Sequence, residues 1–182
     1  LGIDPGTAIL AALAIGAAVG MFNGYLVAYV GIPAFIVTLG GLTLWRGLAF
    51  DSTGGFDMAG LPEPFPTIGY GELLGIPMPI WITAAYFMIM AFTLSSTKLG
   101  RYVYAMGSNE MGARQVGINI RRYKLGVYVI SGLSCALAAM VLMGRMDSSS
   151  GKMAQMFELD AIAAVILGGT SLFGGRGSIW GS

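Results

Sequence analysis

Four long apolar runs constrain this chain more than any other feature of its sequence. They cover residues 8–30, 32–50, 76–94 and 125–143. A helix of roughly 20 apolar residues spans the hydrocarbon core of a bilayer, which is about 30 Å thick. A chain in lipid must satisfy its own backbone hydrogen bonds, so we expect each run to be a membrane-spanning helix. The sequence therefore predicts an all-α integral membrane protein, a polytopic helix bundle.

The composition agrees with this prediction. Charged residues make up 10% of the chain, whereas a soluble domain carries about 25%. The 29 glycines suit close helix packing in lipid. Gly16, Gly20 and Gly24 are spaced four apart within the first run, which predicts a surface that a neighbouring helix can approach closely.

The polar segments between the runs predict the orientation. Residues 51–72 hold four acids and no base, whereas residues 98–124 hold six bases and one acid. Basic segments favour the cytoplasmic side of a membrane. We therefore expect residues 98–124 to be cytoplasmic and residues 51–72 to be extracytoplasmic, joined by the run 76–94.

The basic segment contains the signals of one short helix. Ser108 or Asn109 can cap its start, and Gly117 supplies a stop. Glu110 and Arg114 lie four residues apart and can pair across one turn. A helix of two turns is marginal in water by itself, so we expect a surface to hold it.

Two glycine-rich segments resemble each other. Residues 39–47 read LGGLTLWRG, and residues 167–177 read LGGTSLFGGRG and overlap a shorter apolar segment at 161–173. With the orientation above they run in opposite directions, which is typical of broken or re-entrant helices that line a pathway. Chance resemblance is the alternative. The candidate pathway residues are Phe35, Thr38, Gly40, Gly41, Gly168, Gly169, Thr170 and Ser171.

Polar side chains that a hydroxylated solute could meet are few, and lipid contact or helix packing is the alternative for each. They are Asn23, Thr38, Thr43, Thr83, Ser131, Ser134, Thr170 and Ser171.

Enzymatic chemistry finds little support in the sequence. The segment GGTSLFGGRGS lacks the Gly-Lys-Ser/Thr ending that a phosphate-binding loop requires. The chain has no histidine to activate a serine or bind a metal, and its acids lie in or beside loops rather than as a pair within the membrane. We therefore expect no enzymatic activity, no cofactor and no metal site in this chain, and any ATP to be used by another chain.

Three segments, in this order, resemble the permease subunits of bacterial ABC importers for monosaccharides, the ribose and xylose type. They are IPAFIVTLGGLTLWRGLAF, TKLGRYVYAMGSNEMGARQVGINIRRYK and ELDAIAAVILGGTSLFGGRGSIWGS. The resemblance implies a permease of the bacterial inner membrane that translocates a monosaccharide, such as a pentose. It also implies that the chain is an interior part of a longer permease.

The same resemblance implies three kinds of protein partner. These are a cytoplasmic ABC ATPase, an extracytoplasmic sugar-binding protein and a second permease copy. The short helix would be the coupling helix that rests on the ATPase. Its residues would be Gly107, Asn109, Glu110, Ala113, Arg114, Gly117 and Ile118.

Two other functions have the same composition. One is a channel or secondary transporter for a small neutral solute, which the pair of broken helices would suit equally well. The other is a non-transporting scaffold, whose basic segment would be a topological signal or a contact to anionic lipid.

Overall fold

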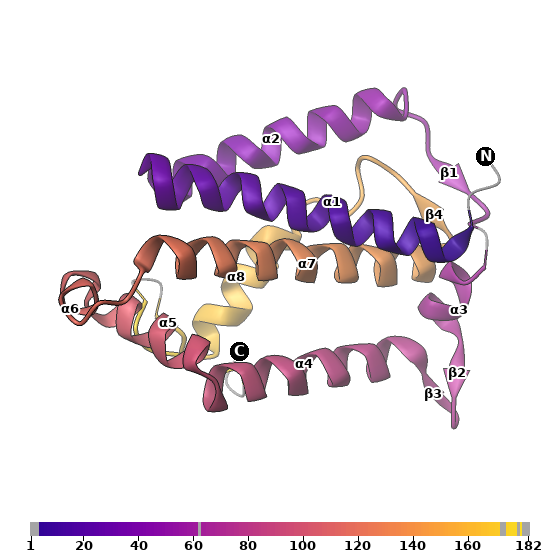
Figure 1. Ribbon diagram of the computed structural model, residues 1–182. Helices are drawn as coiled ribbons and strands as arrows, with labels where there is room; N and C mark the ends of the chain where they lie inside the picture. Colours follow the sequence, from indigo (N-terminus) through magenta and orange to yellow (C-terminus); the bar gives the residue numbers. More distant parts are fainter. Residues whose placement is uncertain (1–3, 62, 172–173, 178, 180–182) are drawn as a thin grey trace. The chain divides into compact units, whose positions relative to one another are not determined.

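The computed structural model describes residues 4–61, 63–171, 174–177 and 179, and helices dominate it (Figure 1). The predicted all-α class is confirmed, and the described residues add four strands of two residues each. The elements are α1 (Pro5–Tyr25), the π-helix η1 (Leu26–Val30), α2 (Ala34–Ser52), β1 (Met58–Ala59), α3 (Phe65–Tyr70), β2 (Glu72–Leu73), β3 (Ile76–Pro77), α4 (Met78–Ser96), α5 (Lys98–Ser108), α6 (Glu110–Gln115), α7 (Ile120–Met146), β4 (Ser148–Ser149) and α8 (Phe157–Leu167).

Four helical segments in the described part of the chain are long and apolar enough to cross a membrane. They are Gly6–Val30, which joins α1 and η1, together with α2, α4 and α7. α7 begins at Ile120, upstream of the predicted run 125–143, so its first turn carries basic residues. Residues 161–167 of the predicted segment 161–173 belong to α8, which stops at Leu167. Residues 172 and 173 of that segment lie outside the described residues.

The chain divides into two compact units. Unit 1 comprises Leu1–Ile82 and Leu125–Met153, and unit 2 comprises Thr83–Lys124 and Ala154–Ser182. α1, α2 and most of α7 belong to unit 1, whereas α5, α6, α8 and most of α4 belong to unit 2.

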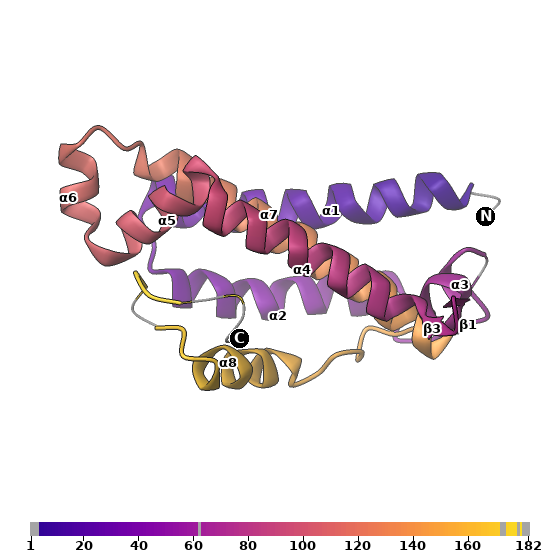
Figure 2. The same cartoon turned by 90° about the horizontal axis from the view of Figure 1, so that it is seen from below.

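In unit 1, α1 and α7 lie side by side in both ribbon views (Figures 1 and 2). A Cβ added to Gly16 would lie 2.6 Å from the carbonyl oxygen of Gly132, and one added to Gly20 would meet the carbonyl oxygen of Tyr128. The missing side chains let the two backbones touch, as the glycine spacing predicts.

The acidic segment 51–72 is tied to the chain that follows α7. Strand β1 pairs antiparallel with β4, with Met58 opposite Ser149 and Ala59 opposite Ser148. The backbone N–H of Leu61 donates to the Asp147 carboxylate at 3.0 Å. These contacts join residues far apart in the sequence, which explains why no local pattern predicts the strands.

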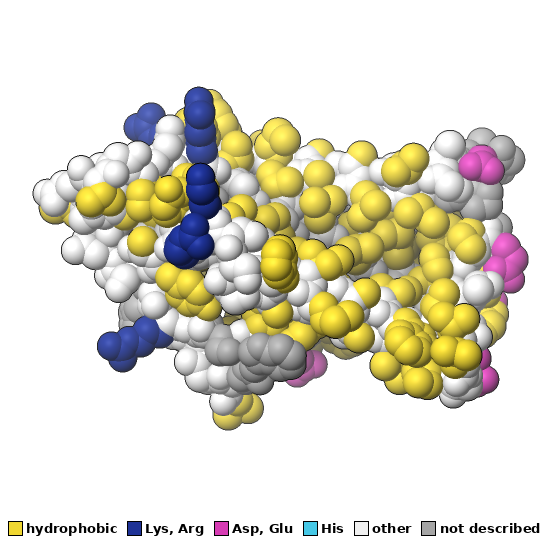
Figure 3. Space-filling view, turned by 60° about the horizontal axis from the view of Figure 1, so that its bottom comes forward, with side chains coloured by type: hydrophobic (Ala, Val, Ile, Leu, Met, Phe, Trp, Pro, Cys, Tyr) yellow, Lys and Arg dark blue, Asp and Glu magenta, His cyan; other side chains and the backbone are white. Residues whose placement is uncertain are grey.

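The surface of the long helices is largely hydrophobic. Large apolar side chains such as Leu10, Phe35 and Phe92 are exposed, and hydrophobic side chains are spread across the face drawn in Figure 3. Among the described residues of unit 1, the buried hydrophobic side chains are Val37, Met140 and Pro66. Apolar surface of this extent needs lipid or neighbouring helices to cover it.

Replacing Gly20 with Ala tests the α1–α7 contact. The added methyl group meets the Tyr128 carbonyl, so we expect a loss of about 1–3 kcal/mol in unfolding free energy from overpacking. Gly40→Ala is the matched control, because a Cβ at Gly40 meets nothing within 4 Å. Thermal unfolding in detergent compares them, and equal midpoints would contradict the contact.

Candidate functional site

The basic segment 98–124 is more helical than its sequence predicts. Residues Lys98–Ser108 form a separate helix, α5, where the sequence prediction had only a loop. Thr97 starts this helix, because its Oγ1 accepts from the N–H of Gly100 at 3.4 Å. The first turn of α7 occupies the end of the segment. The segment is therefore a module of two helices and a helix start.

The predicted short helix is present as α6, Glu110–Gln115. Asn109, rather than Ser108, caps it, since its Oδ1 accepts from the N–H of Gly112 at 2.9 Å. Gly117 ends the turn with a left-handed backbone, at φ 81°. The N–H of Ile118 then donates to the carbonyl of Ala113 at 3.1 Å, which closes the helix end.

The short helix rests on a small hydrophobic core within unit 2. Met106 from α5, Ala113 from α6 and Ile120 from α7 are buried together. Val103, Ile118 and Tyr123 are partly buried against them. The ring of Tyr123 also meets the ring of Tyr102 edge-on, with centroids 4.9 Å apart. The chain itself thus supplies one of the surfaces that hold α6, because Gly117, at φ 81°, turns the backbone back toward this core.

A carboxylate links α6 to α7. Glu110 accepts from Nη2 of Arg114 at 2.8 Å, which is the predicted pair within one turn. It also accepts from Nζ of Lys124 at 2.6 Å. The hydrogen bond from Lys124, followed by the one from Arg114, lowers the pKa of Glu110. Lys124 lies 14 residues along the chain, so no helical spacing indicates this second partner.

The module presents two apolar side chains outward. Met111 is 74% exposed and Val116 is 77% exposed, whereas Ala113 and Ile118 face the internal core. Arg114 is also exposed on α6. Of the residues singled out from the sequence, Ala113 and Ile118 are therefore internal and Arg114 is exposed. Sequence reasoning missed the exposed Met111 and Val116. Their signal was an apolar side chain in a short polar segment, which can indicate a contact with a partner.

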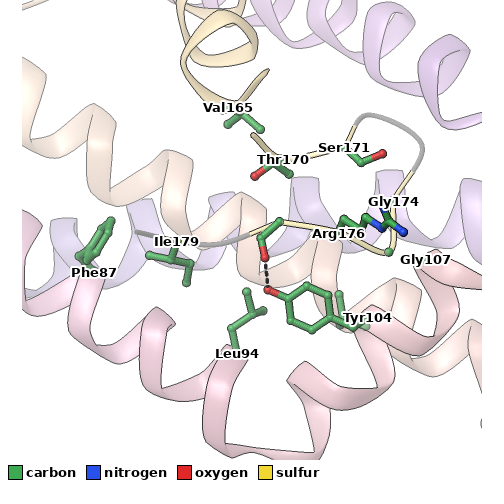
Figure 4. Close-up of a pocket in the computed structure, with 13 residues that line it drawn as sticks. Phe87, Leu94, Tyr104, Gly107, Val165, Thr170, Ser171, Gly174, Arg176 and Ile179 are labelled. Carbon is green, nitrogen blue, oxygen red and sulfur yellow. Dashed lines mark hydrogen bonds between the residues drawn. The ribbon is translucent and has the colours of Figure 1, made fainter. Parts of the chain in front are cut away.

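Gly107 lies in the last turn of α5 rather than on α6. A Cβ there would meet the backbone N–H of Gly175, so α5 and the glycine-rich segment touch through their backbones. Beside this contact the Tyr104 hydroxyl donates to the carbonyl of Gly177 at 2.8 Å (Figure 4). Thr170 and Ser171 line the same cavity of about 410 Å³, which lies within unit 2.

The eight candidate pathway residues divide equally between the units. Phe35, Thr38, Gly40 and Gly41 lie on α2, which continues through the glycine pair without interruption. The predicted break at Gly40–Gly41 is therefore wrong, because both glycines keep helical backbone within α2. Thr38 directs its hydroxyl to the carbonyls of Ala34 and Phe35, at 3.0 and 3.2 Å.

The second glycine-rich segment follows the end of a helix. α8 ends at Leu167, and Gly168 is its cap. Gly169 has a left-handed backbone at φ 82°, a conformation that favours glycine. Gly168, Gly169, Thr170 and Ser171 all belong to unit 2.

Comparisons with known proteins agree with this architecture. A family model described as the permease component of branched-chain amino acid transport systems matches residues 2–182. The chain belongs to this family. Membership in the family and the four apolar helices make this a multi-pass protein of the inner membrane. No solved structure matches the chain.

Curated relatives within the family are named as import permeases. The ribose import permease protein of Escherichia coli is 43% identical over 179 residues, which cover 96% of this chain and 56% of the relative. That of Bacillus subtilis is 43% identical over 183 residues, covering 100% of this chain and 57% of the relative. The autoinducer 2 import system permease protein of Escherichia coli is 38% identical over 175 residues, covering 96% and 51%. The chain thus spans about half the length of these relatives.

The pKa of Glu110 tests the link between α6 and α7. Because the hydrogen bond from Lys124 is the largest cause of its lowering, Lys124→Met should raise this pKa more than Arg114→Met does. Arg122→Met, also in the first turn of α7, is the control and should change it little. An NMR titration of the Glu110 carboxyl carbon measures all three.

The sign of the pH effect follows from the lowered pKa. The carboxylate stabilises the module above the ordinary value of 4.5, and this contribution is lost as the pH falls through the folded-state pKa. A module whose amide-exchange protection did not fall in that range would contradict the link.

Proposed function

We propose that this chain forms the membrane-spanning part of an ATP-driven importer for a monosaccharide, a pentose such as ribose or a similar sugar. The relatives named as ribose import permeases, at 43% identity, are the observation that carries the proposal. The proposal assigns no catalysis to this chain and no cofactor. ATP is bound and hydrolysed by a separate ABC ATPase.

The module of α5, α6 and the start of α7 is proposed as the contact for that ATPase. Its internal core and the Glu110 ion pairs hold α6 in one orientation. Met111 and Val116 remain exposed and apolar on a part of the chain that is rich in basic residues. A groove with apolar walls on the partner would cover both side chains, which gives a short helix a stable seat.

The proposed topology puts residues 98–124 in the cytoplasm and residues 51–72 outside. The charge difference between the two segments supports it. An extracytoplasmic sugar-binding protein would then meet the outer side, and a second permease copy would complete the pathway. The exposed apolar surface of the long helices is consistent with such a neighbour.

Transport would follow from a shift between two conformations. ATP binding brings the two ATPase subunits together and moves the coupling helices that rest on them. The helix bundle then exposes its pathway to the other side of the membrane. Only contacts that differ between the two conformations can drive this change, so the rigidity of the module determines how much of the ATPase movement reaches the bundle.

Uptake of labelled pentoses and hexoses by a strain deleted for the intact gene tests the proposal. We expect loss of uptake of one sugar, with recovery on complementation. Uptake that persists without the ATPase gene would instead indicate a channel or secondary transporter. Normal uptake of every sugar in the deletion strain would indicate a scaffold.

Val116→Asp tests the contact with the ATPase. A buried, unpaired charge in an apolar groove is costly, so the variant should lose copurification of the ATPase and most of the uptake. Phe56→Asp is the matched control, since Phe56 is also 77% exposed but lies in the segment proposed to be outside. Equal ATPase recovery from both variants would argue against the contact.

Replacing Glu110 or Arg114 tests the coupling itself. Loss of the ion pair lets α6 move against α5 and α7, so we expect ATP hydrolysis to continue while uptake falls severalfold. Membrane insertion should be unchanged, as membrane fractionation would show. Wild-type uptake in Glu110→Ala and Arg114→Ala would contradict the role of α6.

A further inference from the structure

Two buried polar atoms in unit 1 stand out, because neither has a hydrogen-bond partner in the described part of the chain. They are Oδ1 of Asn23 on α1 and Nε1 of Trp45 on α2. One is an acceptor and the other a donor. Buried polar groups are nearly always paired, so an unpaired group calls for an explanation such as a functional role.

Gly41 brings the two side chains to the same place. A Cβ built on Gly41 would lie 3.3 Å from Oδ1 of Asn23 and 3.6 Å from Cδ1 of Trp45, the ring atom bonded to Nε1. Gly41 itself is buried. Because it carries no side chain, the amide and the indole border a common space. We refer to Asn23, Gly41 and Trp45 as the polar niche.

The surroundings hold the niche in place. The ring of Phe22 meets the indole of Trp45 edge-on, with centroids 5.7 Å apart and an interplanar angle of 86°. Just beyond Asn23 the helix changes its hydrogen bonding, since η1 begins at Leu26. Such π-helical turns are frequent at functional sites.

The niche lies deep within the apolar segments. Asn23 and Gly41 are each separated from the turn at Gly31 by helix that rises about 1.5 Å per residue. That rise places both about 12–15 Å from the turn, near the middle of a core about 30 Å thick. Polar side chains at this depth are costly and commonly mark a solute pathway.

The chemistry of the two atoms selects the group that fits both. A hydroxyl group can donate to the Asn23 oxygen and accept from the Trp45 N–H at the same time. A carbonyl oxygen satisfies only the indole, and an ammonium group satisfies only the amide. The pair therefore favours a neutral group that donates and accepts at one atom, as a hydroxyl does.

We propose that the polar niche binds one hydroxyl group of the transported sugar during its passage, with Asn23 Oδ1 as acceptor and Trp45 Nε1 as donor. The proposal rests on the function proposed above and names two residues that contact the substrate. Both atoms are shielded from solvent in this structure. The hydroxyl therefore reaches them when the contact between α1 and α2 opens, and such a contact, present in only one conformation, can bias the transport cycle.

Trp45→Phe in the intact protein, assayed with its ATPase and binding protein in proteoliposomes, tests the proposal. The change removes the N–H and keeps an aromatic ring. Loss of one hydrogen bond should lower the maximal uptake rate about three- to tenfold. Trp81→Phe is the matched control, because Trp81 donates to the carbonyl of Leu73 at 3.2 Å and lies outside the niche. It should leave the rate unchanged.

Thermal unfolding separates binding from packing. Removing an unpaired buried donor leaves the melting temperature unchanged or raises it. The proposal therefore expects slower uptake by Trp45→Phe without a loss of stability. Unchanged uptake with a higher melting temperature would overturn it, since the indole would then have only a structural role.

Deoxy sugars identify the hydroxyl. The analogue that lacks the bound hydroxyl should be imported more slowly by the wild type, and Trp45→Phe should slow it no further, since partners in one contact are not additive. Additive losses for every deoxy analogue would overturn the proposal.

Two glycines on α2 give a second comparison. Gly41→Ala fills the niche and should also slow uptake, whereas Gly47→Ala, which meets nothing within 4 Å, should not. Equal rates for the two variants would overturn the proposal. Failure of the wild type to import any monosaccharide would instead reject the function proposed above.

Discussion

Contact between backbones at glycine residues is the interaction on which both units depend. In lipid, apolar side chains gain little by leaving their surroundings, so helices associate through close packing. Gly16 and Gly132 provide that packing between α1 and α7, and Gly69 meets the backbone of Gly144 at the end of α7. In unit 2, Gly107 meets Gly175 in the same way. Each contact tolerates no side chain, so it defines where the two segments lie.

The basic module is stabilised differently, because it does not rely on lipid. It combines a small apolar core, two side-chain helix caps and one carboxylate shared by two cations. Each contribution is modest, but together they order a helix of six residues that would be marginal alone. Met111 and Val116 stay exposed, whereas Ala113 and Ile118 pack in the core. Internal support and the proposed contact with the ATPase thus use different side chains of one module.

The polar niche sacrifices stability, unlike the glycine contacts and the basic module. Leucine at position 23 and phenylalanine at position 45 would suit an apolar interface better than Asn23 and Trp45, whose buried atoms lack partners. Gly41 keeps the space between them free of a side chain. An interface that only packed two helices would not need this arrangement. The proposed hydroxyl group would offset the free-energy cost of these two unpaired atoms, because it would complete both hydrogen bonds.

The sequence by itself determined the membrane class, the four spanning helices, the capped helix at Asn109 and the Glu110–Arg114 pair, because apolar length, capping and helical spacing are local signals. It also indicated the glycine face of α1. Helix α5 has a local cap at Thr97 that sequence reasoning missed. The strands β1 and β4 and the pairing of Lys124 with Glu110 depended on tertiary structure, since their partners lie far apart in the chain. Only the tertiary structure could decide that Gly40 faces open space while Gly41 adjoins Asn23, and that Gly40–Gly41 does not break α2. Adjacent residues on a helix point in different directions, and which of them meets a neighbour is a property of the packed helices.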